Sequence, residues 1–111
     1  MFANAIKEID ASELAQWVND ATHGLRVIDV RQMQEIATGT VPRAEPLPLH
    51  TLPAKVHEFS REEKLVMVCR SGARSAQACM FLQQHGFSNV YNLRGGMMGW
   101  VQSGFTPAQL G

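Results

Sequence analysis

Residues 65–86, LVMVCRSGARSAQACMFLQQHG, determine how the rest of the chain is arranged. The first four are apolar, which is typical of a buried strand. A turn that contains Gly72 and two arginines follows, and a helical pattern then begins with Ser75 as the expected N-cap and stops at Gly86. Cys69 therefore lies between the end of a strand and the start of a helix, where open α/β sheets bind their ligands.

The residues after Cys69 favour the ionised form of its thiol. Backbone N–H groups from Arg70 to Arg74 can point inward as an anion-binding nest, and the first turn of the helix adds a partial positive charge. A thiolate held there is a nucleophile at neutral pH without a general base. We therefore expect Cys69 to be a catalytic nucleophile rather than an ordinary core cysteine.

Alternation of apolar runs and helical patterns predicts an α/β fold for residues 1–111 as a single domain. Strands are expected at residues 25–30, 44–47, 65–68 and 90–92, and helices or helical turns at residues 11–18, 31–37, 52–59, 75–85 and 97–102. Asp10 and Glu13 have the spacing of a capping box for the first helix. Short strands connected through helices indicate a mainly parallel sheet with helices on both faces.

Parallel strands place their carboxyl ends at one edge of the sheet, so residues that follow strands should gather there. Arg31, His50, Cys69 and Arg94 each follow a predicted strand.

We expect Asp29, which lies near the end of a strand, to brace neighbouring backbone or an arginine. The other cysteine, Cys79, is expected in the core, too far along the helix to resolve a Cys69 disulfide. Ala76 and Met80 are expected to face the sheet, together with Cys79 and Phe81.

Three motifs resemble, in order, those of the rhodanese family of single-domain sulfurtransferases. Residues 68–75, VCRSGARS, are similar to its active-site loop. Residues 28–31, IDVR, with Glu35, Gly39 and residues 41–42, are similar to the first signature of the family. Residues 93–96, LRGG, with Gly99 and Trp100, are similar to its C-terminal signature. Thr40 and Arg43 depart from the pattern, because the family often has His and Gly at these positions.

The resemblance implies transfer of sulfane sulfur by double displacement. Cys69 would take sulfur from thiosulfate or a persulfide and pass it, as a persulfide, to cyanide or an acceptor thiol. Substrate binding is expected from the loop, and Arg31 and Arg94 would lie at its rim; the loop residues are Arg70, Ser71, Gly72, Ala73, Arg74 and Ser75. We expect partners to be a small anionic sulfur donor and a thiol or protein sulfur acceptor.

Composition excludes several other classes. With 10 basic and 10 acidic residues the chain gives no electrostatic case for binding nucleic acid or an anionic membrane. Its first ten residues, MFANAIKEID, lack the apolar run of a secretory signal, so we expect a cytoplasmic protein. The two cysteines and four histidines form no metal-binding pattern, and we expect no metal or cofactor. His23, His57 and His85 are expected at the surface.

Two alternatives remain. Cysteine phosphatases and arsenate reductases use a similar loop, but the phosphatase pattern has five residues between cysteine and arginine, and only four separate Cys69 from Arg74. A loop one residue shorter suits a persulfide better than a phosphate. The chain could also be a carrier module that receives sulfur from one protein and hands it to another. The sequence predicts no particular donor, acceptor or oligomeric state.

Overall fold

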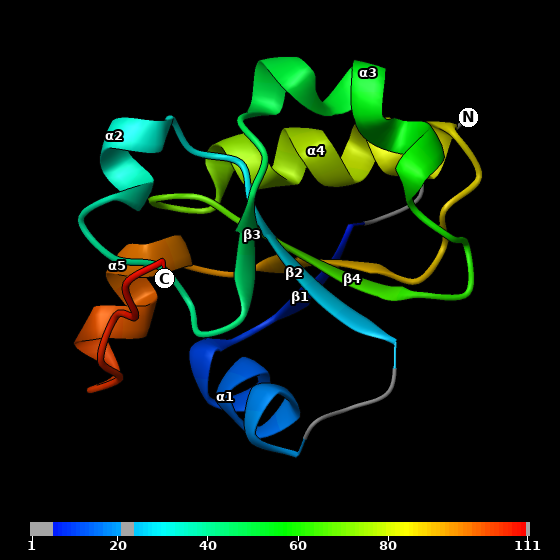
Figure 1. Cartoon of the computed structure of the whole chain (residues 1–111). Helices are drawn as coiled ribbons and strands as arrows, with labels where there is room; N and C mark the ends of the chain where they lie inside the picture. Colours follow the sequence, from blue (N-terminus) through cyan, green and yellow to red (C-terminus); the bar gives the residue numbers. More distant parts are fainter. Residues whose placement is uncertain (1–5, 21–23, 111) are drawn as a thin grey trace.

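The computed structural model describes residues 6–20 and 24–110, and its centre is a five-stranded parallel sheet in the order β1-β5-β4-β2-β3 (Figure 1). The strands are β1 Lys7–Ile9, β2 Leu25–Asp29, β3 Ala44–Pro46, β4 Lys64–Val68 and β5 Val90–Leu93. β4 lies in the middle, paired with β2 and β5. Its last four residues are buried, as the apolar run predicted.

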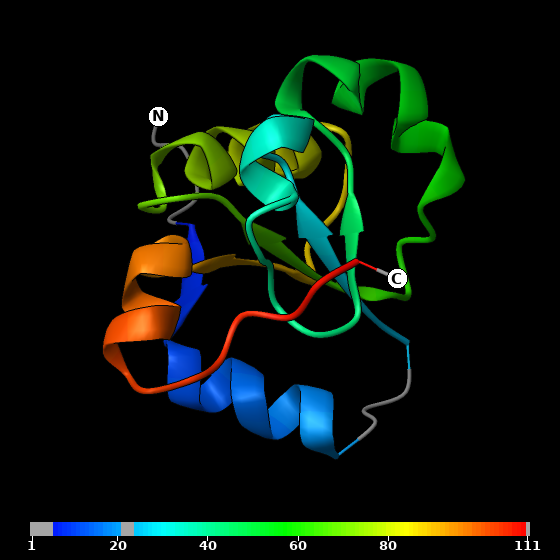
Figure 2. The ribbon, with the colours of Figure 1, turned by 60° about the vertical axis from the view of Figure 1, so that its left-hand side comes forward.

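Helices cover both faces of the sheet, which confirms the expected α/β architecture (Figures 1 and 2). α1 Ala11–Asn19 and α5 Gly96–Gln102 pack on one face through Leu14 and Trp100. The other face carries α3 Leu52–Lys55 and α4 Ala73–Gln84, which pack through Leu52 and Leu82. α2 Met33–Ile36 is a single turn beyond the end of β2. Side chains on the two faces of β4 therefore belong to two separate cores.

α1 begins at the capping box expected from the sequence. The Glu13 backbone N–H donates to the Asp10 carboxylate at 2.8 Å, and the Asp10 N–H donates to the Glu13 carboxylate at 3.2 Å. A cap of this kind contributes about 1 kcal/mol to helix stability. The capping box thus stabilises the first turn of α1, and Leu14 packs the helix against the sheet.

The start of α4 differs from the prediction. Its N-cap is Gly72, with φ of 107° in the left-handed region, and not Ser75, which lies buried one turn inside the helix. The end of the helix agrees with the prediction: the Gly86 N–H donates to the Gln83 carbonyl at 3.1 Å and the Phe87 N–H to the Leu82 carbonyl at 3.0 Å. This is a Schellman motif with Gly86 as the C′ residue.

The buried face of α4 was only partly predicted. Ser75, Ala78, Cys79 and Leu82 are buried, whereas Met80 is 46% exposed and Ala76 is half-buried. The prediction for Met80 was therefore wrong, and the prediction for Cys79 is confirmed. Phe81 is partly buried and packs against the same core as Cys79. Apolar residues occur on almost every side of this helix, so periodicity could not select one face.

Other differences are local. β1 was not predicted, and it pairs with β5 at the edge of the sheet, while each other strand differs by one residue from its prediction. The expected helix at residues 52–59 is the single turn α3 between the 3-10 turns η1 Leu49–Thr51 and η2 Val56–Glu58. The expected surface position of His23 falls within residues 21–23, which lie outside the described residues. In the parts of the chain that the structure describes, every helix is too short to cross a membrane.

The segment near the end of the chain lies along the loop that follows α2 (Figure 2). Thr40 and Ala108 exchange backbone hydrogen bonds of 2.8 and 2.7 Å in an isolated antiparallel bridge. Gly39 faces Pro107 so closely that an added Cβ would lie 2.6 Å from the proline Cβ. This crossing holds the loop in place beside the carboxyl end of β2.

Candidate active site

Cys69 directly follows β4, and the start of α5 holds the loop that it begins. The Met97 and Met98 backbone N–H groups donate to the carbonyls of Cys69 and Arg70 at 2.8 and 3.0 Å. Gly96 permits this approach, because a Cβ there would lie 2.5 Å from both carbonyl oxygens. Gly95 and Gly96, which follow β5, thus bring α5 against the cysteine loop.

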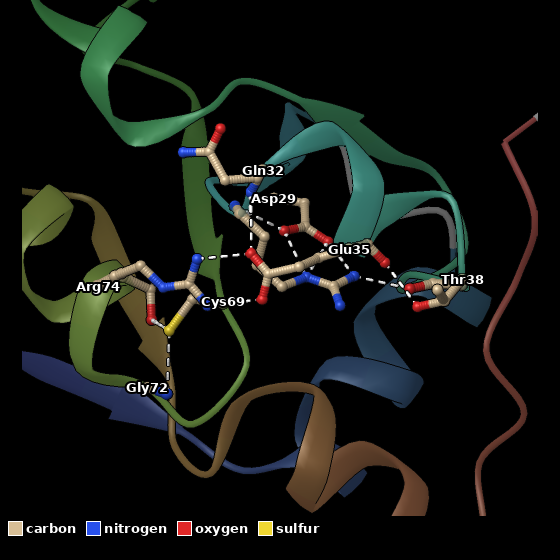
Figure 3. Close-up of polar contacts among 10 residues, drawn as sticks. Asp29, Gln32, Glu35, Thr38, Cys69, Gly72 and Arg74 are labelled. Atoms are coloured by element: carbon tan, nitrogen blue, oxygen red, sulfur yellow. Dashed lines mark hydrogen bonds and ion pairs between the residues drawn. The ribbon is translucent and has the colours of Figure 1, made fainter.

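The sulfur of Cys69 accepts hydrogen bonds from its own loop (Figure 3). The Gly72 N–H donates at 3.0 Å and the Ser75 hydroxyl lies 3.2 Å away. Burial raises the pKa of the Cys69 thiol, but hydrogen bonds from the Ser75 hydroxyl and from the N–H groups of Ser75, Gly72 and Ser71 lower it, and the net effect is a pKa below the ordinary cysteine value. The loop therefore favours the thiolate form of Cys69.

Ser75 connects the sulfur to a buried polar side chain that the sequence analysis did not single out. The Ser75 Oγ lies 2.5 Å from the Oδ1 of Asn92, a residue of β5 that is only 2% exposed. The Asn92 Nδ2 donates to the Gly72 carbonyl at 3.2 Å and to the Glu8 carboxylate at 3.0 Å. An amide in an otherwise apolar strand was the signal for this residue, the same signal that drew attention to Asp29.

Arg74 is bonded to a carboxylate of α2 (Figure 3). Its Nη1 and Nη2 donate to the two oxygens of Glu35 at 2.7 and 2.9 Å. The hydrogen bond from Arg74 lowers the pKa of Glu35 to about 2. Because this bidentate pair occupies the guanidinium, Arg74 joins the cysteine loop to α2, and its expected attraction for a donor stays a prediction.

Asp29 acts as the brace that was expected. Its carboxylate accepts from Arg31 at 2.7 Å and from the Thr40 hydroxyl at 2.7 Å, and Arg31 also donates to the Gly39 carbonyl at 2.7 Å. Arg31 is only 5% exposed. Arg31, expected at the rim, is therefore a largely buried cation whose charge Asp29 compensates, and it also lines the groove between α2 and α5.

The remaining loop and rim residues are exposed or partly exposed. Arg70, Ser71, Ala73 and Arg94 all have exposed side chains. The Arg94 backbone N–H donates to the Ile9 carbonyl at 2.8 Å, which ties β5 to β1. Within the described chain, no salt bridge or side-chain hydrogen bond engages the Arg70 guanidinium. Arg70 and Arg94 therefore both carry exposed charges, and Arg70 directly follows Cys69 in the chain.

Arg70 faces a groove of about 640 Å³ between α2 and α5. Gln34 and Glu35 line it from α2, and Met97, Met98 and Val101 line it from α5. The sequence analysis did not find this groove, since the residues that form it come from two distant segments. Among the described residues, no group of three or more His, Cys, Asp or Glu side chains is arranged to hold a metal ion.

Comparison with known proteins agrees with this fold. The family model described as a rhodanese-like domain matches residues 10–103 of the sequence, so the chain belongs to the rhodanese-like domain family. It is 42% identical over 99 residues to a protein named sulfurtransferase from Allochromatium vinosum, covering 89% of this chain and 92% of the relative. It is 38% identical over 95 residues to the putative sulfurtransferase YtwF of Bacillus subtilis, covering 86% and 90% of the two chains.

A solved structure is also similar. The crystal structure of a rhodanese-related protein from Thermoplasma volcanium superposes with a TM-score of 0.83 at 28% identity, covering 94% of this chain and 99% of that one. The recognised resemblance is therefore confirmed at the level of family and fold.

Proposed function

We propose that the protein transfers sulfane sulfur by double displacement through a persulfide on Cys69. The observation that carries this proposal is the Cys69 sulfur at the end of the central strand, which accepts hydrogen bonds from the Gly72 N–H at 3.0 Å and from the Ser75 hydroxyl at 3.2 Å. Those donors lower the pKa of the thiol, so that a larger fraction of Cys69 is thiolate at a given pH.

In the first step the Cys69 thiolate attacks the outer sulfur of thiosulfate. A new S–S bond forms on Cys69, the S–S bond of thiosulfate breaks, and its electron pair leaves with sulfite. In the second step cyanide attacks the terminal sulfur through carbon, thiocyanate leaves, and the Cys69 thiolate is restored. Neither step needs a general base, and the N–H groups of Ser71, Gly72 and Ser75 stabilise the sulfur anion throughout.

Burial of the sulfur supports a small cargo. Cys69 is 1% exposed, so the sulfur can meet a terminal atom of a donor but not a bulky group. Thiosulfate as donor is further supported by a relative named thiosulfate sulfurtransferase GlpE, from Glaesserella parasuis, which is 29% identical over 85 residues. A phosphatase reaction is disfavoured because Arg74, which would bind the phosphate, is paired with Glu35.

Steady-state turnover tests the proposal. Rates measured at several fixed cyanide concentrations against varied thiosulfate should give parallel double-reciprocal lines, as a double displacement requires. Intersecting lines would contradict a Cys69 persulfide that forms, with release of sulfite, before cyanide reacts. Hydrolysis of an aryl phosphate that Cys69→Ser abolishes would support the phosphatase instead.

A second candidate function is that of a carrier module. One relative, the putative sulfur carrier protein YrkF of Bacillus subtilis, is 30% identical over 99 residues, although the match covers 53% of that longer protein. A carrier would exchange persulfide rapidly with a protein partner and use thiosulfate slowly, with a very high KM. A low KM for thiosulfate would favour the enzyme.

A further inference from the structure

The groove between α2 and α5 is much larger than a thiosulfate ion. Its volume of about 640 Å³ falls in the range of pockets that hold organic ligands. Thiosulfate and cyanide are small ions that would occupy only a fraction of it. A ligand with an organic body would therefore fill the groove better than either ion.

The α5 side of the groove is apolar and partly open to solvent. Met98 and Val101 are 46% and 52% exposed, and Met97 below them is 6% exposed. Exposed large apolar side chains that gather beside a pocket commonly mark a binding site. In the described chain, such side chains elsewhere include Met80 on α4, which lies outside this groove.

The charges around the groove leave one cation for a ligand. Arg31 is paired with Asp29 at 2.7 Å, and Glu35 is paired with Arg74 at 2.7 Å. Arg70 is exposed, and no described side chain pairs with it. A ligand with one negative charge and an apolar body matches this combination.

We propose that the α2–α5 groove binds the sulfur acceptor, a small thiol that has an apolar body and one carboxylate. The inference rests on the proposed function, because the acceptor thiolate attacks the terminal sulfur of the Cys69 persulfide. An S–S bond forms on the acceptor, the Cys69 S–S bond breaks, and its electron pair returns to the Cys69 sulfur as a thiolate. Arg70 pairs with the acceptor carboxylate, and Met98 and Val101 cover its apolar body.

Two mercapto acids of different length test the apolar contact. With thiosulfate as donor, 6-mercaptohexanoate should give a kcat/KM at least about tenfold above that of 3-mercaptopropionate, since each buried methylene contributes about a fourfold preference. In a double displacement the kcat/KM of the acceptor does not depend on the donor half-reaction, so the ratio reports acceptor binding alone.

Two matched methionine variants test whether the preference for the longer mercapto acid arises from contacts in the groove. Met98→Ser should reduce the ratio severalfold, whereas Met80→Ser should preserve it, because both methionines are 46% exposed and only Met98 lines the groove. Equal losses in the two variants would overturn the proposal.

A neutral acceptor tests the charge. 6-Mercaptohexanoate should be preferred severalfold over 6-mercaptohexan-1-ol, and Arg70→Gln should remove that preference. If the wild type turns over thiosulfate with cyanide but does not distinguish these thiols, the groove proposal fails and the proposed function stands. Absence of turnover with both cyanide and thiols would contradict the proposed function itself.

Discussion

The hydroxyl oxygen of Ser75 lies 3.2 Å from the sulfur of Cys69 and 2.5 Å from the Oδ1 of Asn92. One hydroxyl proton cannot serve both acceptors fully. The Asn92 Nδ2 faces the Gly72 carbonyl and Glu8, so its Oδ1 is turned towards Ser75. When the thiol ionises, the Ser75 hydroxyl stabilises the thiolate by donating to the sulfur.

Ser75→Ala is therefore expected to raise the pKa of Cys69 and slow its alkylation by iodoacetamide at pH 7 by roughly tenfold, since a hydrogen bond to a charged group contributes about 1.5 kcal/mol or more. The rate should be measured as a function of pH. Ser71→Ala is the matched control: Ser71 acts on the sulfur through its backbone N–H, which alanine retains. An unchanged pH profile in Ser75→Ala would refute the role of its hydroxyl.

The Glu35–Arg74 pair should make part of the stability dependent on acid. The pKa of Glu35 is lowered from 4.5 to about 2, so the pair stabilises the fold fully above about pH 4.5 and loses its contribution as the pH falls towards 2. Glu35→Gln should cost about 1 kcal/mol at pH 7, with a smaller cost at pH 3.

Urea unfolding at the two pH values measures this difference. Glu58→Gln is the comparison, because its 3.4 Å pair with Lys55 is exposed and should contribute less. A cost for Glu35→Gln that is the same at pH 3 as at pH 7 would show that the ion pair is not its cause.

Arg43 has a φ of 73°, in the left-handed region that L-residues rarely adopt. Arg43→Gly should stabilise the protein by roughly 0.5–1 kcal/mol, because the relief of strain exceeds the entropy that glycine adds to the unfolded chain. Arg43→Ala keeps a Cβ and should gain nothing. Thermal unfolding of both variants checks the prediction, and equal stability of the two would argue against strain.

Gly96→Ala should displace the cysteine loop. Its Cβ would lie 2.5 Å from the carbonyl oxygens of Cys69 and Arg70, whereas a Cβ at Gly104 would meet nothing within 4 Å. Both glycines have positive φ, so Gly104→Ala controls for backbone strain and should cost about 1 kcal/mol. A larger stability loss in Gly96→Ala, together with slower Cys69 alkylation, is expected; similar losses in both variants would contradict the steric account.

Elements with a local signal were predictable from the sequence. The capping box at Asp10, the apolar run of β4 and the C′ glycine at Gly86 each depend on neighbouring residues, and each formed as expected. β1 was missed because three residues with only Ile9 buried carry no clear period, and it forms only because β5 offers it an edge. Its stability is a property of the sheet and not of its own sequence.

The site was predictable in its nucleophile loop and less so around it. The order Cys69, Gly72, Ser75 indicated an anion site, but the N-cap was assigned to Ser75 because serine is the commoner cap. A left-handed Gly72 takes that position and turns Ser75 towards the sulfur. The Glu35–Arg74 pair and the groove join segments far apart in the chain, so no local pattern could have shown them.

The mass of the intact protein after incubation with thiosulfate tests the central claim most directly. The account predicts the addition of one sulfur atom, removed by cyanide, absent in Cys69→Ser and retained in Cys79→Ser, because Cys79 is buried and burial raises its pKa to about 12. An adduct that persists in Cys69→Ser and disappears in Cys79→Ser would contradict the assignment of Cys69 as the sulfur-carrying nucleophile.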